Sequence, residues 1–146
     1  MRRVSKRIIS LFLVLVMLLA MIPAGTVLAS AASGSLDMTA EGLTATYAGD
    51  GTWTGGGNVA HGTVTGKGSL FKQSQSGSLT FTNTRSQAGY ISFDYKITEN
   101  TGSVTIAGNT VTGSGSYAPS AALGSGETVQ VVIKSGKGND KTTSIE

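Results

Sequence analysis

The sequence predicts an all-β protein, an antiparallel β-sandwich preceded by an N-terminal signal-peptide helix. Three observations lead to this prediction. Several segments after residue 31 alternate apolar and polar residues with a period of two, the pattern of strands that bury one face. Glycine-rich turns separate these segments at short, nearly regular intervals. No window after residue 33 carries an apolar stripe with helical spacing.

The N-terminus contains the three parts of a secretory signal peptide. Four basic residues within residues 2–7 precede an apolar run from Ile8 to Ile22, and small residues follow. Ala29-Ser30-Ala31 fits the small-x-small rule, so we expect cleavage after Ala31, with Ala29 as the alternative. The rival interpretation is an uncleaved anchor, but the run is shorter than the roughly 18 residues of a membrane span. Residues 1–31 are therefore expected to direct a single domain, residues 32–146, out of the cell.

Composition excludes several classes of protein. The chain has no cysteine, which excludes a lipid-attached lipoprotein and any disulfide. The net charge of +3 comes from the signal peptide, since residues 32–146 hold seven Lys and Arg against eight Asp and Glu. Lys134, Lys137 and Lys141 lie close together, but Asp140 interrupts them, and we interpret them as a solvated turn. No basic patch for nucleic acid is expected.

The clearest strand is "GYISFDYKIT". Ile91, Phe93, Tyr95 and Ile97 share its apolar face, and Tyr90 lies on its polar face. The same alternation gives further inward positions in the order Leu43, Ala45, Tyr47, Leu79, Phe81, Val104, Ile106, Val129, Val131 and Ile133. The sequence thus predicts seven to nine short strands, a number typical of a β-sandwich.

Other segments are assigned from local chemistry. Leu70-Phe71 is expected to form a short strand, and Gly108-Asn109 a tight hairpin turn with positive φ. "GDGTWTGGG" and "GTVTGKGS" have glycines but lack the spacing of phosphate-binding loops, and no helix follows either of them. Both are predicted to be mobile connections.

Three runs, "GYISFDYKITENTGSVTIAGNTVTG", "LGSGETVQVVIKSG" and "TTSIE", together resemble a jelly-roll module of secreted modular proteins of Gram-positive bacteria. The resemblance covers residues 69–146. It implies a jelly-roll-like sandwich whose last strand pairs back near the start, within a larger extracellular or wall-associated protein.

The last residues, "NDKTTSIE", lead from a turn into a strand. Thr143 and Ile145 are expected to point inward beside a strand from the first half of the domain. In the resembling modules this strand continues further, so we expect a fragment whose final strand is truncated. Its unpaired edge would then be open to strand pairing, with the remainder of the strand or with a partner. An extension of the chain should then raise the melting temperature.

Trp53 and Tyr90 are the candidate ligand-binding residues. Trp53 lies between glycines and could present an open face for stacking a sugar ring, although a core tryptophan on a short strand is the alternative. Tyr90 is a candidate because alternation places it on a polar face.

Nothing indicates catalysis. His61 is the only histidine, and no motif surrounds it, while the carboxylates include no closely spaced pair for glycoside hydrolysis. Asp50 or Asp140 could help to ligate calcium, but the chain lacks an Asp-x-Asp-x-Asp/Asn run, so no metal site is assigned and no cofactor is expected. The sequence favours an exported binding module for carbohydrate or another surface component. A structural or adhesin spacer is the alternative, and the N-terminal part of a glycan-active enzyme is a third hypothesis.

Overall fold

The computed structural model describes residues 32–146; the predicted signal peptide lies outside them. The described chain contains eleven strands and no helix, which confirms the all-β prediction. The strands are β1 (Ala32–Leu36), β2 (Leu43–Gly49), β3 (Thr52–Gly56), β4 (Val59–Thr65), β5 (Ser76–Asn83), β6 (Phe93–Asn100), β7 (Ser103–Ile106), β8 (Asn109–Val111), β9 (Ser114–Tyr117), β10 (Thr128–Lys134) and β11 (Thr142–Ile145).

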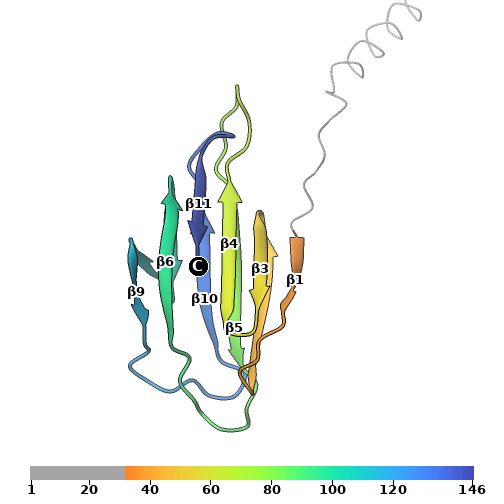
Figure 1. Cartoon of the computed structure of the whole chain (residues 1–146), viewed down its shortest axis with the longest axis vertical. Coiled ribbons are helices and arrows are strands. Elements are labelled where there is room, and N and C mark those ends of the chain that lie inside the picture. The colour runs from red at the N-terminus through yellow and green to blue at the C-terminus, as the bar shows by residue number, and fades with distance from the viewer. Residues whose placement is uncertain (1–31) are drawn as a thin grey trace, which may run out of the picture. The chain divides into compact units, whose positions relative to one another are not determined.

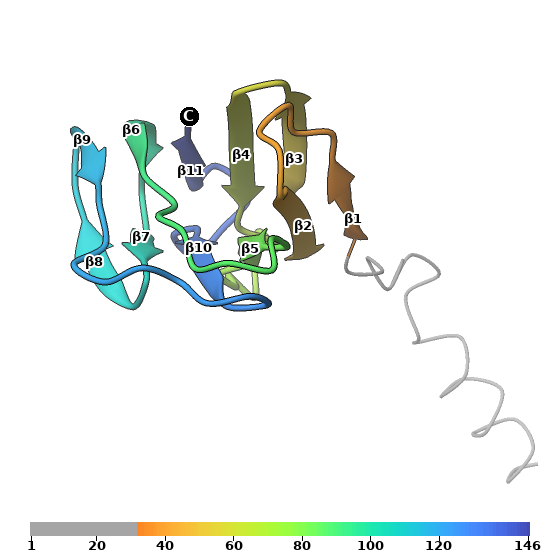
Figure 2. The same ribbon diagram turned by 90° about the horizontal axis from the view of Figure 1, so that it is seen from below.

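The strands form two antiparallel sheets that lie one behind the other (Figure 1). One has the order β1-β2-β5-β10-β7-β8 and the other the order β3-β4-β11-β6-β9. The view from below shows β4, β11 and β6 in one layer and β5 and β10 in the layer facing them (Figure 2). The predicted antiparallel sandwich is therefore correct.

The apolar positions of the alternating strands meet between the two sheets. The buried core comprises Ala45, Trp53, Val64, Leu79, Phe81, Ile91, Val104, Ile106, Val129, Val131, Ile133 and Ile145. Most come from strands that period-two alternation predicted, because successive strand residues point to opposite faces. The Phe93 ring of β6 packs against both sheets. Its centroid lies 5.3 Å from the centroid of the Phe81 ring on the facing sheet, and 5.2 Å from that of the Tyr117 ring on the neighbouring strand β9.

The first segment predicted to be a mobile connection contains β3, and the second begins inside β4, which ends at Thr65, so only its last residues lie in a loop. Alternation failed to reveal them because several of their inward positions carry no large apolar side chain. Trp53 of β3 pairs with Gly62 of β4, and Gly55 pairs with Ala60. A Cβ atom at Gly62 would lie 2.5 Å from the indole ring, so the glycine leaves room for Trp53.

The same aromatic-glycine pairing occurs twice more in the sandwich. Tyr47 of β2 lies opposite Gly34 of β1, and Tyr95 of β6 lies opposite Gly115 of β9. Each ring covers its glycine, and a Cβ there would come within 2.5 Å and 2.7 Å of the tyrosine hydroxyl oxygens. Aromatic side chains shield the exposed backbone of cross-strand glycines in this way.

Two further local predictions are wrong. Leu70 and Phe71 belong to no strand and lie in the loop between β4 and β5. The hairpin turn is Ala107-Gly108 and not Gly108-Asn109, since Asn109 already pairs with Ile106. Both turn residues have positive φ, 48° and 82°, the conformation that a two-residue turn needs to match the strand twist.

The final strand, β11, lies in the interior of its sheet and not at an edge. Thr143 and Ile145 are buried, and β11 pairs with β4 from the first half of the domain, both as predicted. Its other neighbour is β6, which the sequence did not indicate. β11 therefore separates β4 from β6 by the width of one strand.

Candidate functional site

An apolar loop tip is the most exposed hydrophobic feature of the described chain. Leu70 and Phe71 are 90% and 85% exposed. They lie in the loop of residues 66–75, which extends beyond the sheets at the upper end of the molecule (Figure 1). Lys67 and Gln73 close this loop with reciprocal backbone hydrogen bonds of 2.9 and 2.7 Å, so the tip protrudes from a defined base.

A second loop, residues 135–141, supports the first. The N–H of Gly66 donates to the carbonyl of Lys141 at 2.9 Å, and the N–H of Gly138 donates to the carbonyl of Gln73 at 3.4 Å. A Cβ added to Gly66 would lie 2.5 Å from the carbonyl oxygen of Gly138, so only glycine allows the two loops to approach this closely. Residues far apart in the sequence therefore form one surface.

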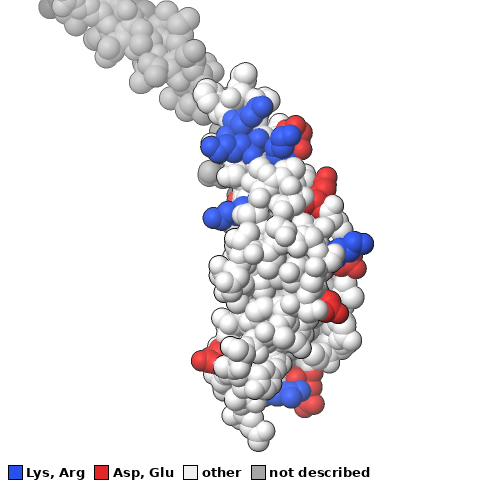
Figure 3. Space-filling model, turned by 90° about the vertical axis from the view of Figure 1, so that its left-hand side faces the viewer, with Lys and Arg blue, Asp and Glu red and all other residues white. Residues whose placement is uncertain are grey.

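Four lysines lie on the two loops that contact each other at this tip. We call this region the tip surface: Leu70, Phe71, Lys67, Lys72, Lys137 and Lys141. Lysine side chains gather at this end of the molecule (Figure 3). Lys67 and Lys141 retain 49% and 47% side-chain exposure although each contacts a carboxylate, Lys67 with Asp50 at 3.4 Å and Lys141 with Asp140 at 3.3 Å. The tip surface combines exposed apolar groups with an excess of positive charge.

Asp50 and Asp140 thus lie beside lysines. Backbone hydrogen bonding, and then the nearby Lys141 and Lys72, hold the pKa of the Asp140 carboxyl below its ordinary value. Asp140 therefore stays ionised and offsets part of the lysine charge. Within residues 32–146, no group of three His, Asp or Glu side chains is arranged to hold a metal ion.

Trp53 is a core residue, only 7% exposed, so its indole face is not open to a ligand. Of the two interpretations of this residue, the structure supports the core position and not the sugar platform. The physical reason is the register with Gly62, which places the ring between the sheets. Its Nε1 atom is buried without a hydrogen-bond acceptor.

Tyr90 is 69% exposed, but it lies in the loop that connects β5 to β6 and not on the polar face of a strand, because β6 begins only at Phe93. Its backbone is fixed: the neighbouring Gly89 exchanges two hydrogen bonds with Leu123, of 2.9 and 2.7 Å. The buried Asn83 adds side-chain bonds from its Nδ2 to the carbonyls of Gln87 and Leu123, at 3.0 and 2.8 Å. Tyr90 thus presents an open ring on a fixed loop, at the opposite end of β5 from the tip surface.

His61 lies on β4, where it is exposed and pairs with Thr54 of β3. The structure does not bring these candidates together. His61 lies on the surface of β4, Trp53 in the core and Tyr90 in the loop between β5 and β6.

Sequence reasoning missed the tip surface although a signal was present. Two adjacent bulky residues cannot both point inward from one strand, because neighbouring side chains point to opposite faces. Leu70-Phe71 within "GKGSLFKQ" therefore indicates an exposed tip at least as well as a strand.

Comparison of the chain with family models, with curated proteins and with solved structures finds no match. Residues 32–146 contain no helix with the length and hydropathy of a membrane span.

Proposed function

We propose that this protein is an exported, non-catalytic β-sandwich module that binds an anionic lipid surface through its tip surface. The observation that carries the proposal is the pair of exposed side chains, Leu70 and Phe71, on a loop that carries two lysines and contacts a second loop carrying two more. Exposed apolar groups cost little in isolation, but clustered at a protruding tip they mark contact sites.

Energetics favour lipid over a purely polar polymer as the surface component. Each bulky apolar side chain removed from water contributes about 1.5–3 kcal/mol, and each lysine near an anionic bilayer contributes about 1 kcal/mol. A polar polymer would attract the lysines and leave Leu70 and Phe71 in water. Two inserted side chains together with several lysines supply the two kinds of signal, apolar and electrostatic, that stable membrane anchoring requires.

The wider context of the proposal comes from the sequence. The signal peptide, residues 1–31, supports export, and the resemblance to secreted jelly-roll modules supports a place in a larger extracellular or wall-associated protein. We also propose, from this sequence resemblance, that the sandwich is related to jelly-roll modules. The alternative is a structural spacer, which predicts that neither the tip surface nor Tyr90 binds a ligand.

The tip surface is tested by vesicle sedimentation of residues 32–146. Vesicles of phosphatidylcholine with about one third phosphatidylglycerol should retain the protein, and replacing Leu70 and Phe71 together by serine should lower partitioning on the order of 100-fold. The matched control is Tyr90→Ser, which removes an exposed aromatic ring at the other end of β5 and should leave partitioning unchanged. Pure phosphatidylcholine should bind weakly. Equal sedimentation of the double variant and the unaltered protein would show that the tip does not insert.

Carbohydrate binding at Tyr90 is the second candidate function. The supporting observation is the exposed ring on a loop that Asn83 and the Gly89-Leu123 bridge hold in place. A rigid aromatic face loses little entropy when a sugar ring stacks on it.

Affinity electrophoresis tests this second function. If Tyr90 stacks on sugar, polysaccharide in the gel should retard the unaltered protein, and Tyr90→Ala should abolish the retardation without shifting the melting temperature. The Leu70 and Phe71 double variant serves here as the control and should still be retarded. Retardation that survives Tyr90→Ala would place carbohydrate binding elsewhere.

A further inference from the structure

A shallow hollow lies on the outer face of the second sheet, between β6 and β9. Phe93 pairs with Tyr117 and Asp94 pairs with Ser116 across these two strands. The Phe93 ring packs on Phe81 in the core, so its neighbour Asp94 points outward. A hollow of about 300 Å³ is lined by Ser92, Phe93, Asp94, Ser116, Tyr117 and Ala118.

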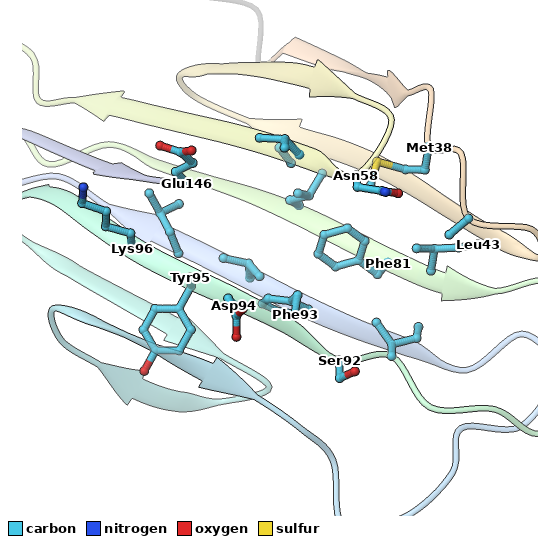
Figure 4. A pocket seen from close by; sticks show the side chains of 17 residues that line it. Met38, Leu43, Asn58, Phe81, Ser92, Phe93, Asp94, Tyr95, Lys96 and Glu146 are labelled. Carbon is cyan, nitrogen blue, oxygen red and sulfur yellow. The ribbon is translucent and has the colours of Figure 1, made fainter.

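Internal residues form all the walls of this hollow. β9 borders β6 on the side of the hollow, whereas β11 and Glu146 border β6 on its other side. In the close-up of β6, the carboxylate of Asp94 is directed away from Glu146 (Figure 4). The hollow therefore does not depend on the last residues of the chain.

Asp94 is the polar centre of the hollow. The hydroxyl of Ser116 donates to its Oδ1 atom at 2.6 Å, which holds the carboxylate in one orientation. A carboxylate has about four acceptor positions, so this bond leaves the others free. Within residues 32–146, no Lys or Arg forms an ion pair with Asp94. The hollow thus offers charged acceptors to a ligand that carries several hydrogen-bond donors.

The charges on this face favour an uncharged ligand. Lys96 lies two residues beyond Asp94 on the same face of β6 and is exposed. A polyanion laid along this face would meet the Asp94 carboxylate, and a polycation would meet the Lys96 ammonium. Like-charge contacts of this kind discriminate against a binding partner. A chain of neutral sugars avoids both contacts and supplies hydroxyl donors that Asp94 can accept.

Tyr90 lies within reach of the same ligand. Tyr90 and Ser92 are exposed, whereas Ile91 between them is buried. Four residues of backbone extend over about 14 Å at most, which limits the separation of the Tyr90 and Asp94 Cα atoms. An oligosaccharide of a few rings spans this distance, so one sugar can stack on Tyr90 while another occupies the hollow.

We propose that the hollow binds one hexose of a neutral polysaccharide chain, the same chain that stacks on Tyr90. Vicinal hydroxyls of this hexose donate to the free positions of the Asp94 carboxylate, and a further hydroxyl donates to the hydroxyl oxygen of Ser116. The small side chain of Ala118 leaves room for the sugar ring. This subsite rests on the second candidate function, sugar stacking on Tyr90, and extends it by naming neutral hexose chains as the ligand.

Titration of residues 32–146 with two neutral glucose chains, cellohexaose and maltohexaose, tests the subsite through amide chemical shifts. At least one of the two should shift the amides of residues 90–94 and 116–118 together. Hexamers of glucosamine and of galacturonic acid carry positive and negative charge, and both should bind at least several-fold more weakly. Shifts confined to other parts of the domain would overturn the proposal.

Asp94→Asn separates the hollow from the stacking residue. It keeps the size of the side chain and removes the charged acceptor, so affinity should fall on the order of tenfold. Ala118→Leu fills the hollow and should lower the affinity at least as much. The matched controls are Glu99→Gln, on the same strand, and Ala121→Leu, on the exposed loop after β9, and both should leave the affinity unchanged.

The results distinguish the hollow from the stacking on which it rests. If Tyr90→Ala abolishes binding while Asp94→Asn and Ala118→Leu bind like the unaltered protein, sugar stacks on Tyr90 but the hollow is not a subsite. If neither neutral hexamer binds at millimolar concentration, both the subsite and the stacking are wrong. Tighter binding of the glucosamine hexamer, lost in Asp94→Asn, would overturn the choice of a neutral chain and identify a cationic ligand.

Discussion

Replacing Trp53 by alanine is expected to lower the free energy of unfolding by about 3–5 kcal/mol, the loss that follows removal of a buried tryptophan side chain. Trp53 is 7% exposed and packs against Gly62 of the neighbouring strand. Glycine has no side chain that could move into the space left by the indole, so the cavity remains open. Urea denaturation followed by far-ultraviolet circular dichroism measures the change without depending on tryptophan fluorescence.

Trp53→Phe is the matched comparison. The Nε1 atom of Trp53 is buried without an acceptor, and a buried unsatisfied donor costs about 1–3 kcal/mol. Phenylalanine keeps much of the apolar contact and removes this donor, so it should cost less than half as much as alanine. An alanine variant with an unchanged denaturation midpoint would contradict the core position of Trp53.

Replacing Gly77 by alanine is expected to destabilise the domain by about 3 kcal/mol, at the upper end of overpacking effects. Gly77 lies on β5, and a Cβ there would collide with the carbonyl oxygen of Asp50 and lie 3.2 Å from Cγ2 of Val64. The Asp50 backbone cannot move aside easily, since its N–H donates to Ser76 at 2.8 Å. Thermal unfolding measures the loss.

Gly89→Ala is the control for Gly77→Ala. The nearest heavy atom to a Cβ at Gly89 is Nδ2 of Asn83 at 4.0 Å, and its φ lies outside the positive range that side chains avoid. This change should alter stability by less than about 0.5 kcal/mol, as is usual for sites without a packing conflict. Similar losses in both variants would show that the close approach to Asp50 does not govern the effect.

The predictable part of the fold consists of strands whose inward positions carry large apolar residues. Phe81 and Val131 were assigned to the core from alternation alone, and both are buried. The inward position of Ile145 followed from the same rule. β3 and β4 escaped prediction because glycine and alanine fill inward positions that apolar residues usually mark, and a ring from a paired strand covers Gly62.

The candidate sites were likewise predicted only in part. Tyr90 was predicted on the polar face of a strand and is exposed on a loop instead, and the exposure of Leu70 and Phe71 depends on a loop that protrudes beyond both sheets. The surrounding lysines come from two loops, residues 66–75 and 135–141, whose contact no local pattern indicates.

The amino-acid sequence by itself determined the all-β class and the inward face of the alternating strands. These are local properties, because side-chain direction along an extended backbone depends only on position in the strand. The tertiary structure alone decided that Trp53 is buried and that β11 lies between β4 and β6. Those features depend on which strands become neighbours, and strand pairing is set by packing between residues distant in the sequence.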